Sequence, residues 1–90
     1  MADDELRRKL EELHDQIEQT DQVDDKGRAL LRDVDGHVQE LLARSEQAAM
    51  KPKPALSRGL EDAIRHFEVT HPTLTEALSD LLTALSHAGI

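Results

Sequence analysis

The stretch DDKGRALLRDVDGHVQELLARSEQAA, residues 24–49, decides the fold of this chain. Its apolar residues recur every three or four positions, which places them on one face of an α-helix: Leu30, Leu31, Val34, Val38, Leu41 and Leu42. Asp24 can cap this helix. Gly27 falls on the apolar face, which predicts the close approach of another helix, whereas Gly36 falls on the opposite face. We expect the flanking segments to form shorter helices that cover the apolar face.

The N-terminal segment has the same helical spacing. A helix is expected to begin at Asp3 or Asp4, either of which can cap it. Its narrow apolar stripe is made of Leu6, Leu10, Leu13 and Ile17. The polar turn that follows, at residues 20–23, favours antiparallel pairing with the long helix.

Two further helices are expected after the long one. Prolines at positions 52 and 54 end the long helix, because a Pro-x-Pro segment favours a stiff, extended spacer. A third helix is then expected from Leu56 or Ser57 to about Thr70, with a fourth beginning near Pro72.

The chain is therefore predicted to be all-α, with four helices forming two antiparallel helical hairpins joined by a Pro-containing linker. The N-terminal acidic hairpin spans residues 1–49, the linker residues 50–55 and the C-terminal hairpin residues 56–90. A chain of 90 residues is one small folding unit overall, in which the hairpins depend on each other.

Composition narrows the classes of partner. The net charge of −8 repels phosphate backbones and anionic lipid, so we expect neither nucleic acid nor a membrane surface as a partner. The chain has no cysteine, which excludes disulfides and thiolate metal sites and fits a reducing cytoplasm. The acidic N-terminus does not have the apolar run of a signal peptide, and no stretch approaches the ~20 apolar residues of a membrane span.

Two Glu-x-x-His spacings, Glu11 with His14 and Glu68 with His71, are the sharpest chemical signal. Helical di-iron sites use two such pairs plus a glutamate from each of two other helices, all directed inward. Helical geometry turns both glutamates away from the apolar stripes, so we expect surface residues here. No metal, cofactor or catalytic residue is predicted, and a di-iron enzyme is a less favoured alternative.

A second enzyme alternative comes from the stretch between Leu31 and Arg44, which resembles the helical chorismate mutases. That resemblance implies a site of several interior basic residues around a dianionic substrate. Here Arg32 and Arg44 leave the apolar stripe and the hairpin is acidic, so a binding function is preferred.

The run Phe-Glu-Val-Thr-His-Pro-Thr-Leu at residues 67–74 carries a more specific resemblance, together with the closing Gly89-Ile90. The chain resembles a family of small bacterial proteins classified as a domain of unknown function. The resemblance implies a short helical protein with no assigned activity. From the residue types we predict a fixed corner made by Phe67, Thr70, His71, Pro72 and Leu74, in which Phe67 packs against the fourth helix and a Thr or His side chain caps that helix.

The remaining prediction concerns partners. The long helix is expected to extend beyond its shorter partner, which would expose Leu41 and Leu42 in a monomer. The candidate interface is Leu30, Val34, Val38, Leu41 and Leu42, and a homodimer is the favoured way to cover it. Two alternatives stay open: the second hairpin folds back over these residues, or a different protein partner binds them.

Overall fold

The computed structural model describes residues 2–44 and 54–87, which form four helices. Their bounds are α1 Ala2–Gln19, α2 Asp25–Arg44, α3 Pro54–Phe67 and α4 Pro72–His87. This confirms the all-α prediction, since the described residues include no strand. The predicted end of the long helix near residue 49 lies outside the described residues, as do the prolyl residue at 52 and the terminal Gly-Ile pair.

Three predicted helix boundaries are wrong by a few residues. Helix α1 begins at Ala2, so Asp3 and Asp4 lie within its first turn instead of preceding it as caps. Helix α3 begins at Pro54, not at Leu56, because proline fits the first turn of a helix, where its missing N–H is not needed. The last two residues assigned to the linker are therefore helical. Helix α3 ends at Phe67, and residues 68–70 form a turn instead of continuing to Thr70.

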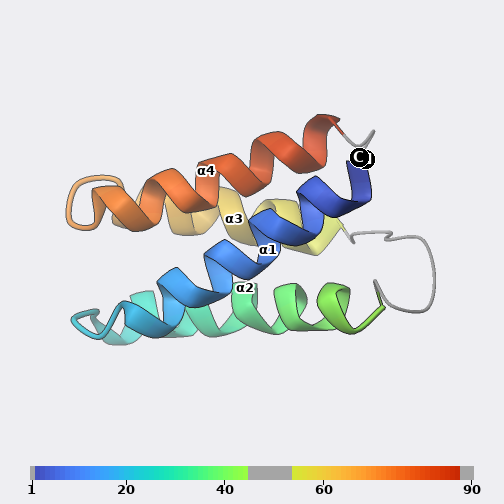
Figure 1. Ribbon diagram of the computed structural model, residues 1–90. Coiled ribbons are helices and arrows are strands. Elements are labelled where there is room, and N and C mark those ends of the chain that lie inside the picture. Colours follow the sequence, from blue (N-terminus) through green and yellow to red (C-terminus); the bar gives the residue numbers. More distant parts are fainter. Residues whose placement is uncertain (1, 45–53, 88–90) are drawn as a thin grey trace.

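The four helices form a closed ring in which each packs against two neighbours (Figure 1). Helix α1 contacts α2 and α4, and α3 also contacts α2 and α4, whereas no Cα atoms of the two diagonal pairs come within 8 Å of each other. Successive helices run in opposite directions, so both short connections, at residues 20–24 and 68–71, lie at the same end of the bundle. The arrangement is an up-down-up-down four-helix bundle.

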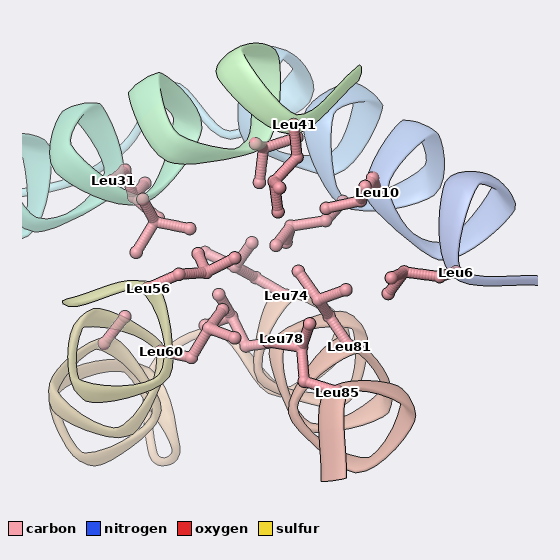
Figure 2. Close-up of a cluster of buried hydrophobic side chains, with 14 of the residues drawn as sticks. Leu6, Leu10, Leu31, Leu41, Leu56, Leu60, Leu74, Leu78, Leu81 and Leu85 are labelled. Carbon is pink, nitrogen blue, oxygen red and sulfur yellow. The ribbon is translucent and has the colours of Figure 1, made fainter. Parts of the chain in front are cut away.

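The core lies along the centre of this ring, where side chains from all four helices point toward one another (Figure 2). Every buried side chain in the described residues, glycine aside, is apolar, and most are leucine. Each buried leucine contributes about 1.5–3 kcal/mol relative to an exposed one. The buried set is Leu6, Leu10, Leu13, Leu31, Val34, Val38, Leu41, Leu56, Leu60, Ala63, Phe67, Leu74, Leu78, Leu81 and Leu85.

The candidate interface of the long helix is used inside one chain. Val34 and Val38 are fully buried and Leu41 is 4% exposed, because α3 packs on the same face of α2. Leu30 and Leu42 are half-buried at the edges of the core. The expectation that Leu41 is exposed in a monomer is therefore wrong, and the alternative in which the second hairpin folds back describes the structure.

The two glycines of α2 differ as the sequence predicts. A Cβ atom placed on Gly27 would lie 2.8 Å from the Phe67 ring, so the absence of a side chain lets α3 approach α2 closely. A Cβ atom on Gly36 would have no neighbour within 4 Å. Gly27 is thus required by packing, whereas the surroundings of Gly36 impose no such requirement.

Candidate functional site

Open grooves run along the outer seams between neighbouring helices. One, between α2 and α3, has a volume of about 470 Å³ and a single apolar wall residue, Leu30, among charged neighbours. A second, between α1 and α4, measures about 450 Å³ and is lined mainly by acidic and amide side chains with Ala77. The third lies between α1 and α2 beside the 20–24 connection and measures about 430 Å³. We call it the α1–α2 groove.

The α1–α2 groove has the most apolar lining of the three. Ile17 from α1, Val23 from the connection and Leu31 from α2 form its apolar part. Ile17 and Val23 are half-buried and packed on the core, so part of each side chain presents apolar surface to the groove. The groove extends this core to the surface, and such surface is typical of binding sites.

Two arginines flank this apolar surface. Arg28 and Arg32 lie one helical turn apart on α2, line the groove and are exposed. In the part of the chain that the structure describes, neither has an ion-pair partner. In a chain with 19 acids and 11 lysines and arginines, two adjacent arginines without carboxylate partners are available to a ligand.

A polar cluster centred on His14 borders the same groove at Asp35. Its Nδ1 lies 2.7 Å from Asp35 Oδ1 on α2, and its Nε2 lies 3.1 Å from Glu18 Oε1, one turn later on α1. Gln39 Nε2 donates to the other Asp35 oxygen at 2.6 Å. Both ring nitrogens of His14 therefore face carboxylates, an arrangement that only the imidazolium form, with two N–H donors, satisfies fully.

The electrostatics of the cluster agree with this geometry. The hydrogen bond to Asp35 raises the pKa of the His14 imidazole, and the charges of Asp35, Glu18 and Asp15 raise it further. Partial burial, second in size to the Asp35 hydrogen bond, lowers the pKa of His14 without reversing the direction of the shift. The cluster thus favours a bound proton on His14.

A second group of contacts joins the two connections at one end of the bundle. His71 Nε2 donates to the Gln22 carbonyl oxygen at 2.9 Å, which ties the 68–71 turn to the 20–24 connection. The Phe67 ring is 1% exposed and makes an edge-to-face contact with His71, at 5.2 Å between ring centroids. Leu74 is buried just after the turn, whereas Thr70 and Pro72 are exposed.

This geometry changes one part of the predicted corner. No side chain from Thr70 or His71 caps α4, because the Thr70 hydroxyl and His71 Nδ1 bind each other at 2.9 Å and His71 Nε2 binds Gln22. The first α4 bond instead runs from Thr75 N–H to the His71 carbonyl. The predicted side-chain cap is therefore wrong, and the corner residues serve to hold the two hairpins together.

Asp24 completes this end of the molecule. Its Oδ1 accepts from the Gly27 backbone N–H at 2.7 Å, which caps α2 as predicted, and also lies 2.9 Å from His66 Nε2 on α3. The contact with His66 and the hydrogen bond from Gly27 lower the pKa of the Asp24 carboxyl. Asp24 thus joins the two hairpins as well as starting a helix.

With this geometry established, comparison with known proteins gives the family. Residues 6–90 match the family described as Domain of unknown function (DUF4404). The chain belongs to the DUF4404 family. No curated protein and no solved structure matches it. The predicted membership of a family of unknown function is confirmed, and the match covers α2, α3 and α4 in full and α1 from Leu6 onward.

The DUF4404 bundle shows how the two Glu-x-x-His pairs are used. Glu11 pairs with Arg7 at 3.1 Å and His14 binds Asp35, so the first pair does not act as a unit. Among residues 2–44 and 54–87, no group of three or more histidine or acidic side chains is placed to hold a metal ion. Nor is any helix there long and apolar enough to cross a membrane.

Sequence reasoning did not find the α1–α2 groove or the His14 cluster of this DUF4404 chain. His14 and Asp35 are 21 residues apart, and each stands next to a buried residue, Leu13 and Val34. A polar residue directly beside the apolar stripe of each helix in an antiparallel pair is the signal that could have linked them. The arginines at 28 and 32 have one-turn spacing, but only the fold shows that they lack partners.

Proposed function

We propose that this chain is a non-catalytic interaction module that binds an acidic, amphipathic helical segment of another protein in the α1–α2 groove. The observation that carries the proposal is the combination of an apolar surface with two arginines that have no acidic partner within residues 2–44 and 54–87. Apolar side chains of a ligand helix would cover Ile17 and Val23, and its carboxylates would pair with Arg28 and Arg32. This is the helix-in-groove mode of recognition, in which aromatic, aliphatic and arginine side chains supply most of the binding energy.

The choice of an acidic ligand follows from local charge. The chain as a whole carries a net charge of −8, so an acidic segment meets favourable charge only where bases are not already paired. Of the two acids in the groove lining, Asp35 is already bound by His14 and Gln39, whereas Asp21 is exposed in the 20–24 connection. A ligand would therefore meet two arginines and one exposed aspartate, a local balance that favours an acidic segment.

A non-catalytic role agrees with how the reactive side chains are used. His14, His66 and His71 all make contacts that hold helices or connections together. The core is apolar, with no buried polar or charged side chain among the described residues. A cytoplasmic setting, where a cysteine-free chain is at no disadvantage, is part of the same proposal.

Peptide selection tests the proposal directly. A random peptide library displayed on phage is selected against the full chain, and the enriched peptides are synthesised and measured by fluorescence anisotropy. We expect sequences with Asp or Glu every three or four positions beside Leu, Ile or Phe. Their affinity should fall at least tenfold, about 1.4 kcal/mol, when Arg28→Glu and Arg32→Glu are combined.

The matched control reverses the charge of two other exposed arginines, which lie on α3 away from the groove: Arg58→Glu and Arg65→Glu. This control has the same change in net charge and should retain the wild-type affinity. Equal losses in both double variants would show a general charge effect and refute the proposed site. Enrichment of basic peptides, insensitive to either pair, would also refute it.

Self-association is the second form of this proposal, with another copy of the chain as the partner. The interface predicted from the sequence is largely buried within one chain, so a second copy would have to use half-buried residues such as Leu30 and Leu42. Light scattering decides the matter, because one chain has a mass of 10.1 kDa. A doubled mass that falls in Leu42→Asp would support the dimer, and a mass of one chain would exclude it.

A further inference from the structure

We propose that His14 is a proton-controlled switch for the α1–α2 groove: protonated, it bridges Glu18 and Asp35 and offsets the charge of Asp35, so that Arg28 and Arg32 outweigh Asp21 among the remaining charges of the lining. This inference rests on the proposed function for the identity of the ligand, an acidic helical segment. The proton site itself stands on the geometry of α1 and α2 and can be tested without any ligand.

The number of N–H donors on the His14 ring decides which of its two contacts can be hydrogen bonds. Asp35 Oδ1 is 2.7 Å from Nδ1 and Glu18 Oε1 is 3.1 Å from Nε2, so both nitrogens need a proton to donate. A neutral imidazole has one N–H. When the neutral ring donates its one N–H to Asp35, the Nε2 lone pair faces the Glu18 carboxylate and the two repel each other. Glu18 can then turn away, because 67% of its side chain is exposed.

The His14 cluster and the α1–α2 groove share one residue. Asp35 belongs both to the His14 cluster and to the lining of the α1–α2 groove, alongside Arg28 and Arg32. Loss of the proton from His14 therefore leaves an uncompensated carboxylate within the groove. That negative charge opposes an acidic ligand and attracts the arginines that would otherwise bind it.

The charged surroundings of His14 can be named from each packed element. From α2 they are Asp35 and, across the groove, the two arginines. From α1 itself they are Glu18 and Asp15. Helix α4 contributes Glu76 and Asp80, which face the opposite seam of α1 together with Asp15. The hydrogen bond to Asp35 raises the pKa of His14 most, burial lowers it, and the charges of Asp35, Glu18 and Asp15 add to the rise.

The proton site is tested by following the histidine ring resonances of the full chain by NMR from pH 5 to pH 9. We expect the His14 midpoint to lie above the usual histidine value of about 6.5, and to fall in Asp35→Asn, which removes the strongest hydrogen bond to the ring. A midpoint at or below 6.5 in the wild-type chain, or one that Asp35→Asn does not change, would overturn the proposal.

Control of the groove is tested with an acidic peptide obtained by the selection described above. Its dissociation constant is measured at pH 6 and pH 8 for the wild-type chain, for His14→Gln and for the control His37→Gln. We expect binding to weaken about three- to tenfold from pH 6 to pH 8 in the wild-type chain. This is the effect expected when one additional negative charge repels an acidic peptide from several ångströms away across a solvated groove. His37 makes only a 3.8 Å contact with Asp33 on its own helix, so its variant should behave as wild type.

The outcomes separate the two hypotheses. Tight binding with the same pH dependence in His14→Gln as in the wild-type chain overturns the switch and leaves the proposed function intact. Failure of every acidic peptide to bind at either pH overturns the proposed function and with it the control of the groove. In that case the NMR midpoint still decides whether His14 is a proton site.

Discussion

Replacing Gly27 with alanine tests how tightly the two hairpins are packed at the loop end of the bundle. Two opposing effects decide the result. Alanine favours the helix by about 1 kcal/mol over glycine, because it loses less backbone entropy. Against this, the new Cβ atom would lie 2.8 Å from Phe67 Cζ, 3.0 Å from Phe67 Cε1 and 2.8 Å from Asp24 Oδ1. Carbon atoms in contact prefer separations of about 3.5–4.0 Å, so something must move.

The magnitude follows from what can move. The Phe67 ring is 1% exposed and lies edge to face with the rings of His66, at 4.8 Å, and His71, at 5.2 Å, so it cannot shift without disturbing both. Overpacking of a core in this way costs about 1–3 kcal/mol. Displacing Asp24 from the N-cap costs about 1 kcal/mol more. After the helix-propensity gain, Gly27→Ala should destabilise the chain by about 1–3 kcal/mol.

The assay is urea denaturation followed by circular dichroism, with Gly36→Ala as the matched control. Gly36 lies on the same helix and is open on its outer side, so that variant should gain about 0.5–1 kcal/mol. The two variants should also move the melting temperature in opposite directions, by about 4–8 °C per kcal/mol. If Gly27→Ala is as stabilising as Gly36→Ala, α3 does not approach α2 as the structure shows, and the explanation of the corner is wrong.

Four further predictions follow from the same structure. Phe67→Ala should cost about 3–5 kcal/mol in urea denaturation, and His71→Ala only about 1 kcal/mol, the value of one half-exposed hydrogen bond; equal losses would contradict this. Leu41→Asp should unfold the chain, whereas Leu42→Asp, at a half-buried position, should leave a cooperative transition by circular dichroism. Asp24→Asn keeps a capping side chain but removes the charge. Because the Asp24 pKa is lowered, the variant should be less stable than the wild-type chain near pH 6, and this difference should disappear as the pH falls through the lowered pKa. His14→Gln should lower stability more at pH 5.5 than at pH 8.5, because a raised pKa adds stability below about 6.5 that is lost as the pH rises through the folded-state value.

The core was predictable because it depends on spacing along one helix at a time. Leu31, Val34, Val38 and Leu41 occupy one face of α2 whatever the other helices do, and burying that face is the main driving force of folding. The tight contact at Gly27 was predictable for the same reason. The Pro-containing linker misled the sequence reading only at its end, where Pro54 starts α3 instead of preceding it.

How the hairpins combine could not be read from spacing. A narrow apolar stripe on α1 and a broader one on α2 are compatible with a second copy of the chain or with the chain's own C-terminal hairpin. The structure shows the second arrangement, in which Asp24 reaches His66, and His71 reaches Gln22. These contacts join residues more than 40 positions apart, so they depend on how the two hairpins are aligned along their length.

The candidate site depends on a still finer feature, the rotation of α1 relative to α2. Successive residues of a helix are about 100° apart, so a turn one residue longer or shorter between the two helices would change which side chains meet across the seam. His14 lies 2.7 Å from Asp35 with the five-residue connection 20–24 in place, and in this register Arg28 and Arg32 line the groove beside Ile17 with no ion-pair partner among the described residues. A one-residue insertion in this connection should therefore preserve helix content while moving the His14 midpoint toward the ordinary histidine value. If helix content and the midpoint both stay unchanged, the helices choose their rotation through the core alone, and the connection has no part in forming the site.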